Sequence, residues 1–244
     1  MEIEGKRILI TGANRGLGRA LALACAEAGA GEVVAGARRP EELGALTDSV
    51  GERAKLTPVR LDVTSDDDVN AAAASGPVDV LVNNAGVAVY GGALKAGMED
   101  VRREIETNYL GVLRTVRAFA PAMVERGGGL IVNVASVLGK VSAPALGTYC
   151  AMKAALLSLS QSLRGDLAGS GVRVIAVLPG TIDTDMSRGF DVEKMTAEQA
   201  AREIVEAIRE EKTEAPIGEG ARGVLAALVA DPAGTEKAFA QFRS

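Results

Sequence analysis

The chain has 244 residues, of which 48% are hydrophobic and 24% charged, with two cysteines, no histidine and a formal net charge of −5. Without an imidazole it cannot form a Ser-His-Asp or Cys-His hydrolase site, a histidine-ligated zinc site or a haem site with a proximal histidine. The acidic balance and the lack of a basic cluster argue against nucleic acid or a membrane surface as partner, and no stretch approaches the roughly 20 apolar residues of a membrane span.

Short apolar runs alternate along the chain with segments of helical period. The runs are 7–11, 32–36, 56–62, 78–83, 130–135 and 172–178, and the helical segments between them are 16–29, 40–51, 65–75, 98–126, which need not be continuous, and 149–169. Almost continuous hydrophobicity is typical of strands covered on both faces of a parallel sheet. The length would suit one large domain or two small ones, but no repeat or linker divides it. We predict one α/β domain over 1–244, a three-layer, doubly wound parallel sheet.

Beyond the sixth run the pattern loosens. Residues 180–195 form a loop rich in Thr, Asp and Gly, and a loop of this length is often a lid or a binding loop. Thr196 and Gln199 fit a capping box at the start of a helix with Ile204, Val205 and Ile208 on one face. A short edge strand at 215–218 and a helix through 224–229 are expected to follow.

A glycine-rich turn, TGANRGLG at 11–18, joins the first predicted strand to the first helix. Glycines let the backbone turn tightly and approach a ligand, and free N–H groups at a helix start favour a phosphate. Such a turn can also merely end a strand, and its GxxxGxG spacing differs from GxGxxG. Its place in a β-α-β unit favours dinucleotide binding.

The end of the second predicted strand indicates which dinucleotide binds. An acid about twenty positions after the glycines would bind a ribose 2′-hydroxyl and repel a 2′-phosphate, but no acid stands there. Arg38 can pair with a phosphate instead, and Arg15 adds a second positive charge. Unless Arg38 is an ordinary solvated residue, this pattern predicts NADP(H) rather than NAD(H).

The third and fourth predicted strands end in polar or small residues, Asp62-Val63 and Asn83-Asn84-Ala85-Gly86. Ligands of open parallel sheets bind beyond the carboxyl ends of the strands, so both segments are expected near the cofactor. Taken alone, two adjacent asparagines would rather signal a plain turn.

The most specific local pattern is Tyr149 four residues before Lys153, with Ser136 thirteen residues before Tyr149 at the end of the fifth run. On a helix, the phenol and the ammonium group lie one turn apart on one face. An adjacent cation lowers the pKa of a tyrosine from its usual ~10, so that Tyr149 can act as acid or base near neutral pH. Alone, the spacing is equally that of an ordinary helix pair.

Taken in order, these motifs and the following Pro179-Gly180 resemble the short-chain dehydrogenase/reductase family over residues 6–186. The resemblance implies a Rossmann fold and a catalytic tetrad of Asn108, Ser136, Tyr149 and Lys153. Tyr149 would exchange a proton with the substrate oxygen, which Ser136 would polarise. Lys153 would bind the nicotinamide ribose and lower the Tyr149 pKa, while Asn108 would position a water next to Lys153. Read from the residues alone, Asn108 is also compatible with a kink inside a helix.

The resemblance further implies a set of cofactor-binding residues. They are Gly12, Asn14, Arg15, Gly16, Leu17, Gly18, Arg38, Asp62, Val63, Asn84, Ala85, Gly86, Tyr149, Lys153, Pro179, Gly180, Ile182 and Thr184. Family members with arginines at the positions of Arg15 and Arg38 usually prefer NADP(H). The segments expected to face the substrate, 87–90, 137–145 and 186–190, are mostly apolar, and the region 181–212 is expected to cover it.

The sequence therefore predicts an NADP(H)-dependent oxidoreductase that interconverts a ketone or aldehyde and an alcohol by hydride transfer, on a hydrophobic small molecule. A non-catalytic NADP(H)-binding redox sensor is an alternative, and so is a 3-oxoacyl-carrier-type reductase, which the C-terminal segment matches less well. A nucleotide-sugar epimerase or dehydratase would need an additional substrate domain.

The remaining expectations concern location and partners. Cys25 and Cys150 are too few for a disulfide framework and form no metal-binding pattern, and we expect them to be packed residues in a chain without a metal site. The N-terminus lacks the regions of a signal peptide, which favours a cytoplasmic protein. The family pairs through two helices, here 112–123 and 154–163, so a homodimer or homotetramer is expected unless these apolar faces only cover the sheet.

Overall fold

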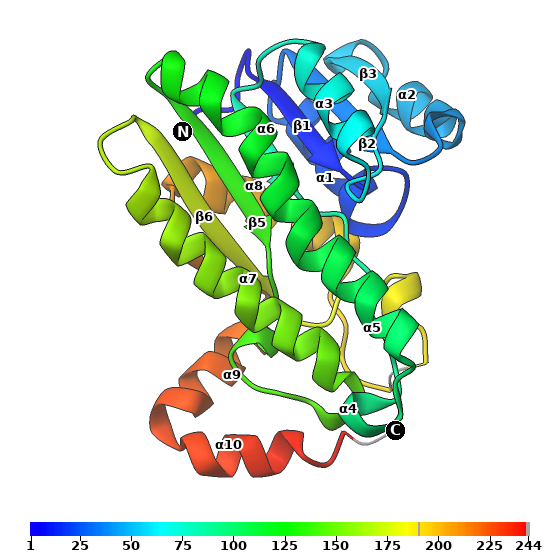
Figure 1. The fold of residues 1–244 in the computed structure, drawn as a ribbon, viewed down its shortest axis with the longest axis vertical. Helices are drawn as coiled ribbons and strands as arrows, with labels where there is room; N and C mark the ends of the chain where they lie inside the picture. Colours follow the sequence, from blue (N-terminus) through cyan, green and yellow to red (C-terminus); the bar gives the residue numbers. More distant parts are fainter. Residues whose placement is uncertain (190, 243–244) are drawn as a thin grey trace.

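The computed structural model describes residues 1–189 and 191–242 (Figure 1). In these residues seven parallel strands form one sheet, in the order β3-β2-β1-β4-β5-β6-β7. The strands are β1 (Arg7–Thr11), β2 (Glu32–Ala37), β3 (Lys55–Arg60), β4 (Val80–Asn83), β5 (Gly129–Val134), β6 (Val172–Pro179) and β7 (Glu214–Ile217). The predicted doubly wound parallel sheet is confirmed.

Helices connect the strands and extend the chain beyond the sheet. The α-helices are α1 (Gly16–Glu27), α2 (Gly44–Val50), α3 (Asp66–Ala74), α4 (Gly92–Lys95), α5 (Met98–Ile105), α6 (Gly111–Glu125), α7 (Gly147–Asp166), α8 (Ala197–Glu210), α9 (Glu219–Ala230) and α10 (Pro232–Phe239). Short 3₁₀ turns are η1 (Pro40–Leu43), η2 (Gly51–Arg53), η4 (Val137–Gly139), η5 (Pro144–Leu146) and η6 (Asp185–Ser187), and η3 (Glu106–Leu110) is a π-helical turn.

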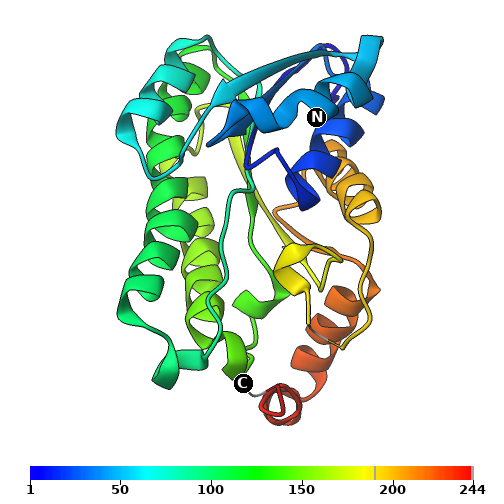
Figure 2. The same cartoon turned by 90° about the vertical axis from the view of Figure 1, so that its right-hand side faces the viewer.

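The sheet separates two apolar cores. Helices α1 and α8 cover one face and α6 and α7 the other (Figure 2). Because successive side chains of a strand point to opposite faces, Ile8 and Ile10 lie in the first core and Leu9 in the second. This arrangement explains why the central strands are apolar along most of their length rather than at alternate positions, whereas the edge strands β3 and β7 carry exposed polar residues.

Two features predicted near the C-terminal end are confirmed. The side chain of Thr196 accepts a hydrogen bond from the backbone N–H of Gln199 at 3.1 Å, and the side chain of Gln199 accepts one from the backbone N–H of Thr196 at 3.1 Å. This capping box begins α8 as expected. The short edge strand is β7, which pairs with β6.

The long helical segment predicted over 98–126 is interrupted. α5 passes into the π-helical turn η3 and then into α6. Asn108 lies in this irregular turn, where an extra residue per turn alters the direction of the side chains. Asn108 therefore lies where the α-helical hydrogen-bond pattern of the predicted segment is interrupted.

The long loop after β6 has some structure of its own. It contains η6, and Ile182 forms a bridge with Met195. Phe190, predicted to face the substrate, lies outside the described residues, as do Arg243 and Ser244 at the end of the predicted domain. Among the helices that the structure describes, none has the length and apolarity required to cross a bilayer.

Candidate active site

The carboxyl ends of β1 and β4 are joined by the buried hydroxyl of Thr11. This oxygen accepts hydrogen bonds from the backbone N–H groups of Asn84 at 3.0 Å and Ala85 at 2.9 Å. The side-chain amide of Asn84 in turn donates to the carbonyl oxygen of Thr11 at 2.9 Å. The predicted segments at 11–18 and 84–86 are therefore held side by side at the centre of the sheet.

The glycines of the first turn have distinct structural reasons. Gly12 and Gly16 adopt φ values of 67° and 53°, in the left-handed region that favours glycine. Gly18 is buried, and a Cβ atom there would collide with the carbonyl oxygen of Gly12 and lie 2.5 Å from Nδ2 of Asn84. Only a glycine lets the first turn of α1 lie this close to the ends of β1 and β4.

The start of α1 has the properties of an anion site. Its N-cap residue, Arg15, makes no side-chain capping bond, and the first turn carries no acidic residue. The first N–H groups of a helix have no intrahelical partner and carry a partial positive charge. Together with the glycine turn, this geometry fits the pyrophosphate of a dinucleotide.

The two arginines predicted at the cofactor differ in their contacts. Arg38 follows β2 and is exposed, and its side chain makes no hydrogen bond or ion pair with any other residue that the structure describes. Nη1 of Arg15 lies 3.1 Å from a carboxylate oxygen of Asp185 in η6. Sequence reasoning missed Glu42, which accepts a hydrogen bond from the side chain of Asn14 at 2.7 Å. Glu42 lies in the turn η1 after β2, several residues beyond the strand end at which an acidic residue was expected for NAD(H) binding.

Asp62 and Val63 follow the end of β3 at Arg60, two residues earlier than the strand was predicted to end. Oδ1 of Asp62 accepts hydrogen bonds from the backbone N–H and the hydroxyl of Thr64 at 3.0 and 2.8 Å. The carbonyl oxygen of Val63 accepts one from Arg114 at 2.7 Å. These contacts fix the short connection from β3 to α3, which lies at the edge of the sheet formed by β3.

Asn108 is buried and contacts the segment after β4. Its Oδ1 accepts a hydrogen bond from the N–H of Val87 at 2.9 Å, and its Nδ2 donates to the carbonyl oxygen of Val87 at 2.8 Å. A Cβ atom on Gly86 would lie 3.2 Å from Oδ1 of Asn108 and 4.0 Å from Nζ of Lys153. Asn108, Gly86 and Lys153 thus converge on one place.

Tyr149 and Lys153 lie one turn apart on α7, which begins at Gly147. Nζ of Lys153 is 5.5 Å from the centre of the Tyr149 ring and donates a hydrogen bond to the carbonyl oxygen of Val134 at 2.7 Å. Ser136 follows the end of β5, where its hydroxyl accepts from the N–H of Leu138 at 3.1 Å. The structure therefore brings the four residues of the predicted tetrad to the carboxyl ends of the central strands.

The pKa values of the tyrosine and the lysine are set mainly by desolvation. Burial lowers the pKa of Lys153 to about 8, and the nearby Glu104 opposes this shift. Desolvation raises the pKa of Tyr149, as does the neighbouring Cys150, whereas hydrogen bonding with Ser136 lowers it. The expectation that Lys153 would bring the Tyr149 pKa below its ordinary value is therefore wrong for this structure, because the loss of solvent outweighs the stabilisation of the phenolate.

The loop after β6 reaches back over the glycine turn. The hydroxyl of Ser136 donates to the carbonyl oxygen of Pro179 at 3.4 Å, and the N–H of Gly180 donates to Ile217 at 3.1 Å. A methyl carbon of Thr184 lies 3.3 Å from the place of a Cβ atom on Gly16. The predicted residues of this loop thus lie between the tetrad and the start of α1.

A chain of buried polar side chains lies below the site and was missed by sequence reasoning. Nδ2 of Asn83 donates to Asn133 at 2.9 Å, Asn133 donates to Ser160 at 2.9 Å, and Thr115 donates to Asn83 at 2.7 Å. Buried polar groups need such partners. The network joins β4 and β5 to α6 and α7, but no sequence pattern reveals partners so far apart in the chain.

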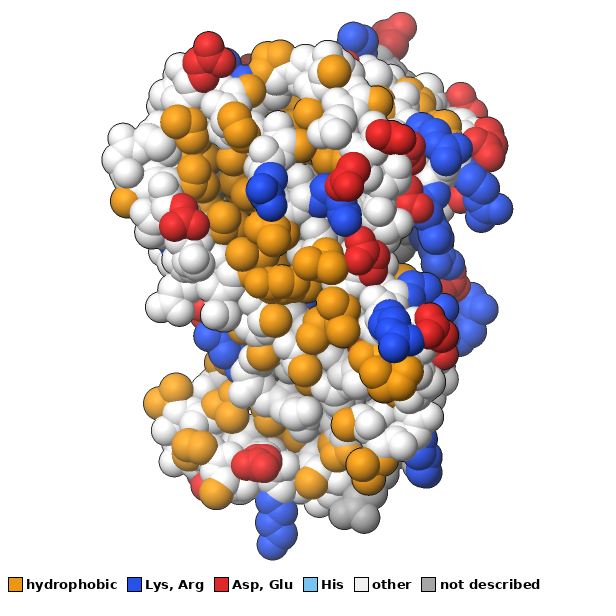
Figure 3. Space-filling view, in the orientation of Figure 1, with side chains coloured by type: hydrophobic (Ala, Val, Ile, Leu, Met, Phe, Trp, Pro, Cys, Tyr) orange, Lys and Arg blue, Asp and Glu red, His pale blue; other side chains and the backbone are white. Residues whose placement is uncertain are grey.

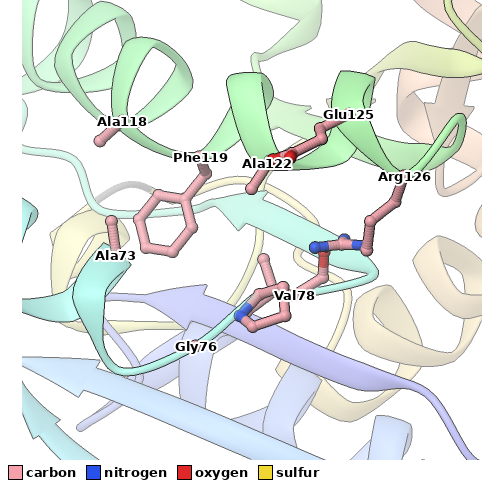
Figure 4. A pocket seen from close by; sticks show the side chains of 9 residues that line it. Ala73, Gly76, Val78, Ala118, Phe119, Ala122, Glu125 and Arg126 are labelled. Carbon is pink, nitrogen blue, oxygen red and sulfur yellow. The ribbon is translucent and has the colours of Figure 1, made fainter.

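A surface pocket of about 310 Å³ lies elsewhere, beside α6 (Figure 4). The guanidinium group of Arg126 donates to the carbonyl oxygen of Val78 at 2.7 Å beneath it. Its lining residues are Ala73, Gly76, Pro77, Val78, Ala118, Phe119, Ala122, Glu125 and Arg126. Because residues 76–78 precede β4, this pocket is at the opposite end of the strands from the tetrad.

The parallel sheet, the glycine turn at α1 and the Tyr149–Lys153 pair define an oxidoreductase that uses a nicotinamide cofactor. The model of the short chain dehydrogenase family matches residues 6–195. The chain belongs to the short-chain dehydrogenase/reductase family, whose fold binds nicotinamide cofactors and whose members act on small molecules.

Individual relatives differ in substrate and cofactor. The ketoacyl reductase HetN of Nostoc sp. PCC 7120 is 33% identical over 225 residues, covering 87% of this chain and 78% of that protein. A short chain dehydrogenase of Burkholderia cenocepacia in complex with NADP has a TM-score of 0.90 and 38% identity, covering 98% of this chain and 99% of its own. A 3-ketoacyl-(acyl-carrier-protein) reductase of Brucella melitensis, complexed with NADH, has a TM-score of 0.81 and 28% identity, covering 90% and 99%.

Proposed function

We propose that this chain is an NADP(H)-dependent reductase that interconverts a hydrophobic ketone or aldehyde and the corresponding alcohol. The observation that carries the proposal is the convergence of Tyr149, Lys153, Ser136 and Asn108 beside the glycine turn. When bound, the nicotinamide cofactor supplies or accepts the hydride. The protein positions the substrate oxygen and exchanges its proton.

Tyr149 is the proton donor in this proposal. Because desolvation raises its pKa, the phenol keeps its proton at neutral pH and can give it to a carbonyl oxygen during reduction. Ser136 holds the same oxygen through its hydroxyl group. Lys153, whose pKa is lowered to about 8, still carries a positive charge in most molecules at neutral pH and binds the ribose hydroxyls.

Asn108 has a more indirect part. Both polar atoms of its side chain are occupied by Val87. We infer that its side chain fixes the segment after Gly86, and that the backbone of the π-helical turn holds the water expected beside Lys153. π-Helical turns are frequent at functional sites.

Several charges support NADP(H) as the preferred cofactor. Arg38 presents an exposed guanidinium group after β2, and Arg15 lies in the glycine turn. A 2′-phosphate bound between them would receive charge-assisted hydrogen bonds. The negative charge of Glu42, which accepts a hydrogen bond from Asn14, would repel a 2′-phosphate and so opposes this preference. The solved structures of similar proteins include complexes with NADP and with NADH.

The region 181–212 is proposed to cover the substrate. The hydroxyl of Tyr90, in the segment after β4, donates a hydrogen bond to the carbonyl oxygen of Met186 in η6. Phe239 of α10 packs with Ala143, Leu146 and Cys150 next to Tyr149. These contacts place mostly apolar side chains around the phenol and favour a hydrophobic substrate.

Reduction of a 3-oxoacyl thioester is a second candidate function. The names of HetN and of the Brucella reductase favour it, because both proteins are described as ketoacyl reductases. A 3-oxoacyl thioester also presents a ketone, so the same four residues would serve. The difference lies in the substrate segments rather than in the tetrad.

Both candidates can be tested with purified protein by following NADPH absorbance. A panel of aliphatic, aromatic and steroidal ketones and aldehydes is compared with a 3-oxoacyl thioester, and NADPH with NADH. The first proposal expects turnover of a hydrophobic carbonyl with NADPH preferred. A kcat/KM highest for the thioester would favour the second, and no consumption with any compound would favour a non-catalytic NADP(H)-binding sensor.

We also propose a homodimer or homotetramer formed through α6 and α7. Apolar side chains gather over these helices (Figure 3), and a groove of about 540 Å³ lies between them. It is lined by Val116, Arg117, Ala120, Pro121, Val124, Glu125, Leu163, Asp166 and Leu167. Light scattering after size exclusion measures the mass, and a Val124→Glu variant should dissociate the assembly.

A cytoplasmic location agrees with the free thiols of Cys25 and Cys150.

A further inference from the structure

Glu104 is a buried acid one turn before Asn108. Among the residues that the structure describes, only two charged side chains are buried, Glu104 with 0% and Lys153 with 6% of their surface exposed. Burying a charge is costly unless an opposite charge or hydrogen bonds compensate it. These two buried charges have opposite signs and lie on α5 and α7, which contact each other.

The carboxylate anchors the segment after β4. Oε1 of Glu104 accepts a hydrogen bond from the N–H of Val89 at 2.9 Å, one turn away from the pair between Asn108 and Val87. One face of α5 and η3 therefore holds both Val87 and Val89 in place beside the tetrad.

The second oxygen of Glu104 has a different environment. Oε2 is buried and has no hydrogen-bond partner among the described residues. An unpartnered carboxylate oxygen in a site of low dielectric acts on its neighbours mainly through its charge. The neighbours that it affects are Tyr149, Cys150 and Lys153, and it raises the pKa of each.

Other charged groups near Glu104 are paired away from α7. On α5 itself, Arg103 is 2.8 Å from Asp100, and Arg102 pairs with Glu99. Glu106 is 2.8 Å from Arg114. On the side of α7, the titratable groups are Lys153, Tyr149 and Cys150. Tyr90, which lies in the segment after β4, also raises the pKa of Tyr149. The charge of Glu104 therefore acts mainly on Tyr149 and Lys153 of the tetrad and on the adjacent Cys150.

We propose that Glu104 is a positioning residue of the reaction: its carboxylate anchors the segment after β4 and supplies the buried negative charge that keeps protons on Tyr149 and Lys153. This inference rests on the proposed function, in which Tyr149 donates its proton to a carbonyl oxygen. Removing the charge would let both groups lose their protons at lower pH. Glu104 therefore favours carbonyl reduction at neutral pH.

The composition allows a direct test, because the chain has three tyrosines and no tryptophan. Tyrosinate absorption is followed after rapid pH jumps, before alkaline unfolding. The difference between each protein and its counterpart carrying Tyr149→Phe isolates the Tyr149 phenol. Glu104→Gln retains an oxygen for the N–H of Val89 but loses the charge. The matched control is Glu106→Gln, the same change two residues away on the side facing Arg114.

We expect Glu104→Gln to lower the midpoint of the Tyr149 titration by at least about one pH unit, because a unit charge within about 12 Å at an effective dielectric constant of about 20 contributes at least about 1.4 kcal/mol. Glu106→Gln should leave the midpoint unchanged. Glu104→Asp keeps a charge and should stay close to the unmodified protein. An unchanged midpoint in Glu104→Gln, or an equal decrease in Glu104→Asp, would overturn the proposal.

A measurement on the unmodified protein avoids the risk that a variant does not fold. The carboxyl carbon of Glu104, observed by NMR in protein labelled at glutamate and assigned with Glu104→Asp, should have the shift of a carboxylate at neutral pH. A shift typical of a protonated carboxyl group would overturn the proposal.

Turnover supplies an additional readout. The decline of carbonyl reduction at alkaline pH should begin about one pH unit lower in Glu104→Gln than in Glu106→Gln. An identical decline in the two variants would contradict the role of Glu104. If the unmodified protein reduces no carbonyl at all, the proposed function fails, whereas the tyrosine titration still decides whether Glu104 holds the proton on Tyr149.

Discussion

Replacing Gly18 by alanine should separate the start of α1 from the ends of β1 and β4. The new Cβ would lie 2.9 Å from the carbonyl carbon of Gly12 and 2.5 Å from Nδ2 of Asn84, about 1 Å inside ordinary contact. Alanine favours a helix over glycine by about 1 kcal/mol. The collision involves backbone atoms that cannot rotate away, so overpacking of about 3 kcal/mol should dominate. We therefore expect a net loss of about 2 kcal/mol.

For a domain of this length, that loss lowers Tm by about 4–8 °C. Moving the first N–H groups of α1 by about 1 Å should also weaken NADPH binding at least about tenfold. Thermal unfolding by circular dichroism and NADPH fluorescence measure the two effects.

Gly223→Ala provides the matched control for this variant. Gly223 lies inside α9, and a Cβ atom there meets nothing within 4 Å. The control should be more stable by about 0.4–1 kcal/mol, with unchanged NADPH binding. If Gly18→Ala behaved like Gly223→Ala in both assays, the close approach of α1 to the strand ends would be refuted.

Three further variants test the charges and contacts around the sheet. Arg38→Asp should move the ratio of kcat/KM for NADPH over NADH toward NADH by about 100-fold or more, since like charges would meet at the 2′-phosphate; an unchanged ratio would mean that the phosphate binds elsewhere. Desolvation raises the pKa of Glu32, but hydrogen bonds from Thr57, Arg7 and Lys55 lower it from 4.5 to about 2. The ionised Glu32 therefore stabilises the fold above about pH 4.5, and this stabilisation is lost as the pH falls toward 2. Glu32→Gln should lower the free energy of unfolding in urea by about 2–3 kcal/mol at neutral pH and by less in acid. A difference that does not depend on pH would contradict this. Thr11→Val removes the oxygen that accepts hydrogen bonds from the N–H groups of Asn84 and Ala85, and should lower the free energy of unfolding by about 1–3 kcal/mol. Identical unfolding curves for the variant and the unmodified protein would show that these N–H groups do not depend on Thr11.

The sheet could be predicted from sequence because its physical signals are local. The central strands β2, β1, β4, β5 and β6 are mostly buried on both faces, so their residues are almost continuously apolar. The glycines between β1 and α1 mark a turn that few other residues allow. The capping box of Thr196 and Gln199 is a local signal of the same kind. The short α4 and the terminal α10 were not predicted, since segments of one or two turns carry little periodicity.

The electrostatics of the site depend on contacts between distant segments. No spacing in the sequence indicates that Glu104 is buried beside α7, or that Glu42 accepts a hydrogen bond from Asn14. The direction of the Tyr149 pKa was wrong for a related reason. The spacing to Lys153 reveals an adjacent cation, whereas the larger effect, desolvation, arises only when the chain is folded.

The central claim is that the Tyr149 phenol supplies the proton for carbonyl reduction. Tyr149→Phe removes one oxygen and leaves the glycine turn and Lys153 in place. With the best carbonyl substrate and saturating NADPH, kcat should fall by about 10²–10⁴-fold while the NADPH Kd changes by less than about twofold. A variant that retained most of its kcat would contradict the account.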